Sequence, residues 1–571
     1  MRKWLVAILV GVFLGAFALQ IYAAKSDSQT TDEAIHLVAG YTYLTKGDFR
    51  LDPEHPPLIK ELSALPLLLA NLRTDFTSMW DNAGNYYYDS WQEARVLGEK
   101  LLYGWGNDAG KVLLLGRLAP ILLTLILGFF AFFWAKKLYG EKAGVLAAFL
   151  VLFFPNILSH GHLINTDLGL TLFTLIAVYF WGKFLKHINI KENWLNLLLA
   201  GIFSGLAMAS KFTAIILFFI LLILAIVKLA QDKKQYATAF FSYLLVLVIS
   251  FFVVWSTYGF SLQSPPEIKE GLSEKVTFEI RNFNKFYDSF DVFQSENSAE
   301  VPSQYNNVYA FVRPVLIPAD FFKGFVFVTT HALGGHGSFL LGMNSNDGWW
   351  YYFPVAIFFK TPIPIFILFT LAIIYRKKLS AKDNFDELLL IMPPAIYLTL
   401  AMVSKADLGI RHILPIFPFI FIYISKTINI FHFSRKNWLK VIVAVSVVWY
   451  LVSALISFPD YLSYFNEFAL GPKNGHKILT DSNLDWGQDI YRVKTYIDQN
   501  NVEVSYMTYP WDGQMALNYY GLNYPELKPD NTNAKGYVII SATYYETNAY
   551  KWIKQYPAKQ ITPGVYLVDI N

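Results

Sequence analysis

The chain contains 571 residues, of which 54% are hydrophobic, 17% aromatic and only 16% charged. Soluble domains usually carry about 25% charged residues, so this composition is typical of an integral membrane protein. A formal net charge of +4, without a basic block interleaved with aromatic residues, argues against a nucleic-acid partner. The absence of cysteine excludes disulfides, thiolate metal sites and a cysteine nucleophile.

The N-terminal stretch begins with Met1, Arg2 and Lys3 and continues with an apolar run from Trp4 to Ala23. A secretory signal peptide has a shorter apolar core and a small-residue cleavage site, which "QIYAAKS" matches poorly. We therefore expect an uncleaved signal anchor that leaves Thr30 outside the cytoplasm.

Hydropathy predicts about eleven membrane spans, because each needs roughly 20 largely apolar residues. In chain order the predicted spans are 3–23, 111–137, 141–159, 165–186, 194–210, 212–230, 237–258, 351–375, 387–404, 409–430 and 438–458. The expected fold class is therefore an all-α polytopic membrane protein, with one small α/β domain after the last span.

The distribution of Lys and Arg predicts which loops face the cytoplasm, where these residues concentrate. If the N-terminus is cytoplasmic, the inner loops are "KKLYGEK", "KFLKHINIKEN", "KLAQDKKQ", "YRKKLSAKD" and "SKTINIFHFSRKNWLK", which are all short and basic. The long segments 24–110, 259–350 and 459–571 then lie outside. We expect a multi-pass protein of the plasma (inner) membrane with an extracytoplasmic C-terminal domain.

Two domains follow from this topology. Residues 1–458 form the membrane domain, with 24–110 as a first outer catalytic loop and 259–350 as a large outer loop. Residues 459–571 contain strand-like runs at "VEVSYMTY", "GYVIISATYY" and "GVYLVDI" and a helix candidate at "DIYRVKTYIDQN". This tail predicts a small α/β domain outside the membrane.

The first outer loop carries two adjacent acids, Asp32 and Glu33, where a helix is expected to begin. Asp32 and His36 are four residues apart, so they share a helix face. Asp32 can alternatively serve as a simple N-cap. The same loop continues with "DPEHPPLIKEL", in which the prolines suit a helix start and His55 has no such structural explanation. The following apolar helix is too short to span and is expected to lie in the membrane interface.

Further polar residues fall at the predicted outer ends of spans. Arg117 lies about two turns inside the second span, where it could snorkel toward the surface. Asp167 opens the fourth span, where an N-cap is the alternative role. Lys211 in "ASKFTA" opposes the positive-inside rule, which favours a functional role. The outer mouth of the tenth span, "SKADLGIRHILPIFP", adds Lys405, Arg411 and His412.

Acids and cations together at a membrane surface suit a substrate with a phosphate at the headgroup level and an apolar tail in lipid. Cations can hold the phosphate, and a carboxylate can deprotonate an attacking hydroxyl. Sugar transfer from a lipid phosphate needs both. Two alternatives stay open: a transporter or flippase of lipid-linked glycans, and a scaffold whose tail binds an envelope partner.

Several sequence motifs occur in the same order as in known protein families. "DEAIHLVAGYTYLTKGDFRLDPEHPPLIKEL" resembles the first-loop pattern of the protein O-mannosyltransferases and the bacterial aminoarabinose-lipid A transferases. "GRLAP", "NTDLGL", "ASKFTA" and "RHILPIFP" resemble later motifs in the same order, over roughly residues 1–460. These proteins are family 39 glycosyltransferases with the GT-C fold.

The resemblance implies an inverting glycosyltransferase that takes its sugar from a polyprenyl phosphate at the outer face. It implies Asp32 as the general base and Glu33 as a neighbour that shapes the acceptor site. The implied phosphate and sugar pocket comprises His55, Arg117, Asp167, Lys211, Arg411 and His412. The sugar stays open between hexoses, mannose among them, and pentoses.

The acceptor and the use of a metal stay open as well. Residues 259–350 do not show the repeated sugar-binding domain of the eukaryotic O-mannosyltransferases. The acceptor can therefore be a protein, a lipid or a glycan. The O-mannosyltransferase pattern requires no metal, so no cofactor is expected to be required, whereas related oligosaccharyltransferases use a divalent cation. "DEAIH" and "HGH" could ligate one, although the same groups suit a hydrogen-bonded acid–base site.

Overall fold

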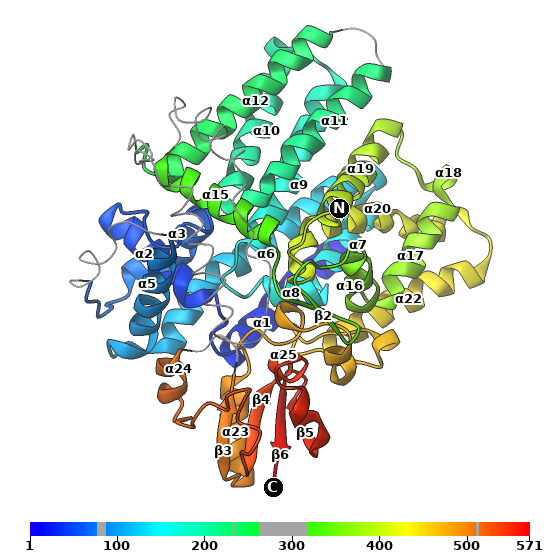
Figure 1. Ribbon diagram of the computed structural model, residues 1–571. Coiled ribbons are helices and arrows are strands. Elements are labelled where there is room, and N and C mark those ends of the chain that lie inside the picture. The colour runs from blue at the N-terminus through cyan, green and yellow to red at the C-terminus, as the bar shows by residue number, and fades with distance from the viewer. Residues whose placement is uncertain (77–86, 232–234, 262–317, 510–512) are drawn as a thin grey trace.

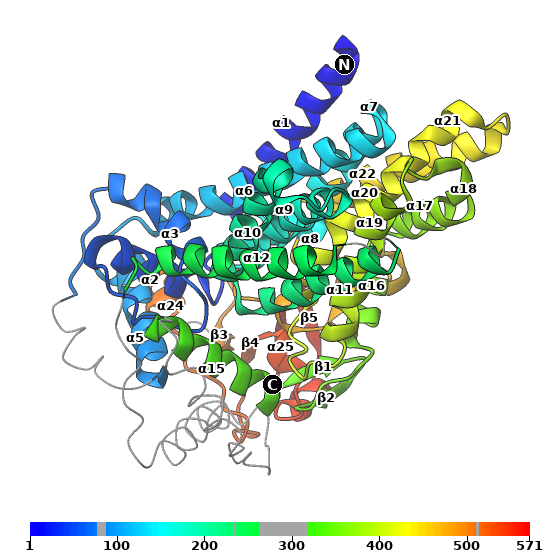
Figure 2. The ribbon, with the colours of Figure 1, turned by 90° about the horizontal axis from the view of Figure 1, so that it is seen from above.

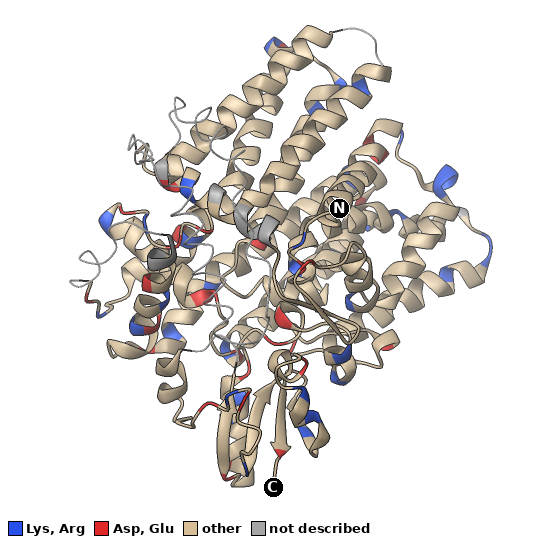
Figure 3. Cartoon of the chain, viewed as in Figure 1, with Lys and Arg blue, Asp and Glu red and all other residues tan. Residues whose placement is uncertain are grey.

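The computed structural model describes residues 1–76, 87–231, 235–261, 318–509 and 513–571. Most of these residues are helical. Figure 1 shows a large group of helices, with a small sheet and the C-terminus at one end. Figure 3 shows that charged residues lie mainly at the ends of the long helices and in the region around the sheet.

In the described part of the chain, 8 helical segments are long and apolar enough to cross a membrane, or up to 9 if a bent pair counts as one span. The 8 are α1 (Lys3–Ser26), α6 (Ala109–Tyr139), α9 (Asp167–Lys186), α10 (Ile190–Ser210), Phe212–Gln231 with α11 (Ile215–Gln231), α12 (Tyr236–Thr257), Ile410–His432 with η4 (Ile410–Ile416) and α20 (Phe417–Ser425), and α22 (Asn437–Ile456). The bent pair is α16 (Tyr352–Lys360) and α17 (Ile363–Ile374), which meet at 104°. The chain is a multi-pass integral membrane protein.

Two of the predicted spans, 141–159 and 387–404, are not among these single long apolar helices. Residues 141–159 form α7 (Glu141–Leu152) and α8 (Pro155–His160), because Pro155 lacks an N–H and starts a new helix. At about 1.5 Å per residue, α7 is shorter than the roughly 30 Å hydrocarbon core. Residues 387–404 fall largely in α19 (Asn384–Ala401), which carries two acids in its first turn and two internal prolines.

The spans differ in how much surface they leave outside the bundle. In α9, 89% of the most apolar stretch of 18 residues is buried inside the structure. The buried share of the corresponding stretch is 28% in α12 and 22% in α1. Figure 2 shows α1 extending away from the other helices at its N-terminal end. α9 is therefore the central helix, and α1 and α12 offer their apolar side chains to lipid.

The first loop forms a compact helical unit beside the spans. It contains α2 (Glu33–Lys46), α3 (Leu58–Ala64), η1 (Leu65–Leu69), α5 (Tyr87–Glu99) and η2 (Lys100–Gly104). Gly40 of α2 lies so close to α3 that an added Cβ would be 2.1 Å from the Lys60 carbonyl oxygen. The location of α3 in the membrane interface stays a prediction, and exposed leucines in η1, with Leu69 at 94%, agree with it.

Residues 262–317 of the large loop, which are most of the 259–350 prediction, lie outside the described residues. It contains α15 (Ala319–Gly334) and a hairpin of β1 (Ser338–Leu340) and β2 (Met343–Ser345). A short helix, α18 (Arg376–Leu379), follows α17, and α21 (Ile430–Phe433) precedes α22.

The C-terminal part contains the predicted strands and helix. Its sheet has the order β3 (Val504–Thr508), β4 (Tyr537–Ser541), β6 (Val565–Asp569) and β5 (Ala558–Thr562), with β3 and β4 parallel and the other pairs antiparallel. Three helices accompany it: α23 (Ile490–Asn500), α24 (Gln514–Tyr519) and α25 (Ala542–Tyr545). The preceding segment, with Leu479 and Leu484 fully buried, packs into the main core. The domain boundary at residue 459 stays a prediction.

Candidate active site

Four of the predicted site residues meet at the ends of separate helices. Asp32 is the N-cap residue of α2, Asp167 is the first residue of α9, Lys211 directly follows α10, and Arg411 lies in η4. The side chain of Asp32 makes no capping hydrogen bond, so its carboxylate is free to face the other three. We call Asp32, Asp167, Lys211 and Arg411 the charged cluster.

The charged cluster alternates acids and cations. Lys211 Nζ donates to Asp167 Oδ1 at 2.6 Å. Arg411 Nη1 lies 3.4 Å from Asp32 Oδ2 and 3.7 Å from Asp167 Oδ2, so it bridges the two acids. The Asp32 side chain is 24% exposed and that of Asp167 is 1% exposed. Asp32 is therefore the more accessible carboxylate of the charged cluster.

His55 lies in a buried group next to the charged cluster. Its ring is 5.4 Å from that of His36, whose Nδ1 is 3.0 Å from Asp52 Oδ2. Lys60 Nζ reaches the same carboxylate at 3.2 Å. Burial and the nearby Lys211 ammonium keep the pKa of His55 well below its ordinary value, so this imidazole is neutral at physiological pH. His36 thus pairs with Asp52 instead of Asp32.

Glu54 is a site residue that sequence reasoning missed. Burial, together with the neighbouring carboxylates of Asp52 and Asp32, raises its pKa to about 8, although Arg411 and Lys211 oppose this shift. A carboxyl group that keeps its proton at neutral pH donates a hydrogen bond. The acid directly before "HPP" is the sequence signal that could have found it.

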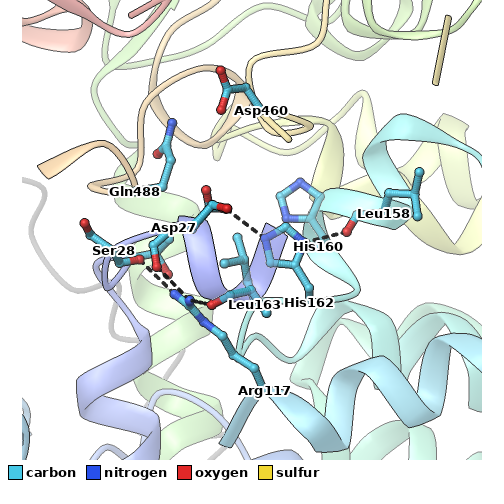
Figure 4. A network of polar contacts seen from close by, with 12 residues as sticks. Asp27, Ser28, Arg117, Leu158, His160, His162, Leu163, Asp460 and Gln488 are labelled. Atoms are coloured by element: carbon cyan, nitrogen blue, oxygen red, sulfur yellow. Dashed lines mark hydrogen bonds and ion pairs between the residues drawn. The ribbon is translucent and has the colours of Figure 1, made fainter. Parts of the chain in front are cut away.

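Glu33 and Arg117 form a closed pair away from the charged cluster. Arg117 Nε and Nη2 donate to the Glu33 carboxylate at 2.8 and 2.5 Å. The other three N–H donors reach the carbonyl oxygens of Ala24, Asp27 and Ser28 at 2.6 to 2.8 Å. Figure 4 shows Arg117 pointing toward the backbone of Asp27 and Ser28. All five donors are used, so the structure does not bring Arg117 together with Lys211 and Arg411.

Both oxygens of the Glu33 carboxylate also accept several hydrogen bonds. Besides Arg117, it accepts from the backbone N–H groups of Thr30 at 2.9 Å and Ile164 at 3.0 Å. Burial alone would raise its pKa, but Arg117 and these donors outweigh burial and lower it. The pair fastens the residues before Asp32 to α6 and to the turn before α9.

Segment 482–492, which follows the last span, forms one wall of the site. Arg411 lies over the Trp486 ring, 4.2 Å from its centroid, and its Nε donates to Ser482 Oγ at 3.2 Å. The Trp486 carbonyl accepts from the Thr31 N–H at 3.1 Å, one residue before Asp32. From the sequence, only the end of this segment was assigned a structure, as the start of the helix at "DIYRVKTYIDQN", and Ser482 and Trp486 were assigned no role.

Further contacts tie this wall to the chain before α2. His162 Nε2 lies 2.8 Å from Asp27 Oδ2 (Figure 4). Arg492 Nη2 donates to Asp27 Oδ1 at 2.6 Å. The Ser28 N–H donates to the Gln488 carbonyl at 2.9 Å.

The remaining candidates occupy different surroundings. His412 follows Arg411, and its Nε2 is buried without a hydrogen-bond partner among the described residues. Lys405 forms an exposed pair with Asp347 at 2.6 Å.

Within the described ranges, no group of three or more His, Cys, Asp or Glu side chains could hold a metal ion. His36 and His162 each face a different carboxylate, Asp52 and Asp27.

The middle of the chain matches a known family. Residues 109–258 match the family model described as dolichyl-phosphate-mannose-protein mannosyltransferase. This confirms the family resemblance seen in the sequence motifs. The matched mannosyltransferase segment is about a quarter of the chain, and it contains Arg117, Asp167 and Lys211 but neither Asp32 nor Arg411.

Solved structures resemble the chain at low identity. ArnT from Cupriavidus metallidurans bound to undecaprenyl phosphate is 12% identical, with a TM-score of 0.48 over 100% of this chain and 99% of that chain. The oligosaccharyltransferase AglB from Archaeoglobus fulgidus, in complex with an inhibitory peptide and a dolichol-phosphate, is 13% identical, with a TM-score of 0.46 over 100% and 74%. The protein O-mannosyltransferase Pmt1-Pmt2 complex of S. cerevisiae is 19% identical, with a TM-score of 0.31 over 45% and 33%. No curated protein matches the chain by sequence.

Proposed function

We propose that the chain is a membrane glycosyltransferase that moves a sugar from a polyprenyl-phosphate-linked donor to an acceptor hydroxyl. The observation that carries the proposal is the charged cluster, in which the partly exposed Asp32 carboxylate lies beside Arg411, with Lys211 on the buried Asp167. The match of residues 109–258 to the mannosyltransferase family supports it. In this proposal the membrane domain has the GT-C fold, and the charged cluster faces the outer side of the membrane.

The proposed reaction is a single displacement with inversion at the anomeric carbon. Lys211 and Arg411 hold the donor phosphate by charge-assisted hydrogen bonds. As the acceptor oxygen attacks the anomeric carbon, Asp32 takes the hydroxyl proton. The bond between the anomeric carbon and the phosphate oxygen breaks, its electron pair stays on that oxygen, and the two cations stabilise the polyprenyl phosphate that leaves.

Other residues have supporting parts in this mechanism. Asp167 holds the Lys211 ammonium in place at 2.6 Å. Glu54 carries a proton at neutral pH and can donate it in a hydrogen bond to the sugar or phosphate. Glu33 and Arg117 fix the backbone before Asp32, and we assign them a positioning role.

The position of the charged cluster argues against the transporter alternative. Transporters place coupling and substrate sites near the bilayer midplane, at broken helices. Here Asp167 and Lys211 lie at the start of α9 and the end of α10, which are helix termini. A site at the ends of spans suits chemistry at the headgroup level. The sugar, hexose or pentose, and the acceptor, protein, lipid or glycan, are not specified by this geometry.

The test is sugar release by purified protein from a panel of radiolabelled polyprenyl-phosphate sugars. Wild type is compared with Asp32→Asn and with Asp347→Asn, an exposed acid that serves as the matched control. We expect release by wild type and by the control, and loss of release with donor binding retained in Asp32→Asn. Release that persists in Asp32→Asn would remove Asp32 as the base, and failure of wild type on every donor would refute the enzyme class.

A further inference from the structure

A polar cavity adjoins the charged cluster on the side of the C-terminal residues. Its walls come from the β1–β2 hairpin, α16, the loop before η4, the segment before α23, and α25. Its polar lining residues are His336, Ser338, Asn344, Tyr352, Asp407, Thr480, Asp481, Thr543 and Thr547. Lys and Arg are absent from this lining.

Asp407 is the residue that marks this cavity as a binding site. Its side chain is 2% exposed, and its Oδ2 accepts from the Trp349 N–H at 2.6 Å. The turn at Gly348 (φ +66°) permits this contact, since an added Cβ would lie 2.5 Å from Asp407 Oδ2. Asp407 Oδ1 is buried and has no hydrogen-bond partner within the described ranges. A buried acceptor without a partner is costly, so this oxygen fits a donor supplied by a ligand.

The rest of the lining offers acceptors as well. Asn344 Oδ1 is also buried without a partner in the described part of the chain, because its Nδ2 donates to the Glu546 carbonyl at 3.2 Å. Asp481 places a second carboxyl group in the wall. Burial lowers the pKa of His336, so its imidazole adds no charge to oppose the two acids.

The cavity is directly joined to the proposed phosphate site. Thr480 and Asp481 line it, and the next residue, Ser482, accepts a hydrogen bond from Arg411 at 3.2 Å. The proposed phosphate-holding residue Arg411 thus contacts the residue directly after Asp481. The free space of about 30 Å³ exceeds the roughly 10–15 Å³ that one water needs and is far too small for a sugar ring.

We propose that this cavity is a specificity subsite that takes one hydrogen-bond-donating substituent of the donor sugar, a hydroxymethyl or an amino group, on Asp407 and Asp481. The inference rests on the proposed function and deepens it, because it states which sugars fit. A sugar without a donor group at that position leaves the buried Asp407 oxygen unpaired and binds less tightly.

Binding of defined lipids to the full-length protein in nanodiscs tests the subsite. The probes are undecaprenyl phosphate, undecaprenyl-phosphate mannose, its 6-deoxy analogue, and an undecaprenyl-phosphate pentose that carries an amino group. The variants are Asp407→Asn and Asp481→Asn, with Asp347→Asn as the exposed control. Two separate variants protect the test against a folding failure in one of them.

We expect both variants to bind undecaprenyl phosphate like wild type and to lose about 10- to 100-fold in affinity for the sugar lipid that fills the subsite. The loss disappears with the deoxy analogue if the substituent is a hydroxymethyl. If the substituent is an amine, the loss of affinity in the variants is larger for the amino pentose than for the mannose lipid. The reason is that Asn accepts a hydrogen bond but carries no charge to attract the ammonium group.

Unchanged affinities for every sugar lipid, or an equal loss for undecaprenyl phosphate alone, would overturn the subsite. If wild type releases sugar while the variants bind all probes normally, only the subsite fails. If wild type neither binds undecaprenyl phosphate nor releases sugar, the proposed function and the subsite both fail.

Discussion

Replacing Arg117 with lysine separates a structural role for this cation from a role in holding phosphate. The guanidinium uses five N–H donors on five buried acceptors, whereas a lysine ammonium has three donors. At least two of these five contacts are therefore lost in Arg117→Lys. At about 1–3 kcal/mol for each lost contact to a buried oxygen, the free energy of unfolding falls by about 2–6 kcal/mol.

The assay combines thermal unfolding of the purified protein with equilibrium binding of undecaprenyl phosphate. We expect Arg117→Lys to lower Tm clearly, while the folded fraction keeps the wild-type Kd. Arg95→Lys is the matched control, because the Arg95–Glu99 pair is partly exposed and such pairs contribute at most about 1 kcal/mol. A Kd that rises tenfold or more, with Tm unchanged, would refute the positioning role and return Arg117 to the phosphate site.

Three further predictions concern the charged cluster and its surroundings. Lys211→Ala removes one charge-assisted contact and should weaken undecaprenyl phosphate binding about 10- to 100-fold by equilibrium binding; an unchanged Kd would exclude Lys211 from the phosphate site. Trp486→Ala should lower kcat/KM by about 2- to 30-fold through loss of the cation–π contact with Arg411, and Trp486→Phe should restore most of it; equal losses in both variants would refute the contact. Because the pKa of Glu54 is raised to about 8, its protonated form stabilises the fold below the ordinary carboxyl pKa, and this stability is lost as pH rises through 8. Tm should therefore fall less between pH 5 and 8 in Glu54→Gln than in wild type, and parallel Tm profiles would contradict the raised pKa.

Local sequence patterns predicted the elements that depend on local physics. The amphipathic run at "DIYRVKTYIDQN" became α23, and three apolar runs became β3, β4 and β6. The strand β5 was not predicted, because "AKQIT" has few apolar residues and is ordered by its pairing with β6. Hydropathy alone also could not show that Pro155 divides one apolar segment into two short helices.

The sequence indicated which residues belong to the site better than it indicated which residues they contact. Lys211 as an outer-face cation and Asp167 at a helix start are placed together by the fold. Arg117 was recognised as a charge inside a span, but its partner Glu33 is 84 positions away in sequence. Ser482 and Trp486 contact Arg411 across more than 70 positions, so no local pattern could assign them to the site.

The wall formed by segment 482–492 has a consequence for biosynthesis. Ser482 and Trp486 follow α22, the last spanning helix among the described residues, so they emerge from the ribosome after all those spans. A nascent chain that has inserted every one of these spans still lacks the ring beneath Arg411 and the backbone contact at Thr31. The order of translation therefore leaves the site incomplete until segment 482–492 has been made and packs against Arg411 and Thr31.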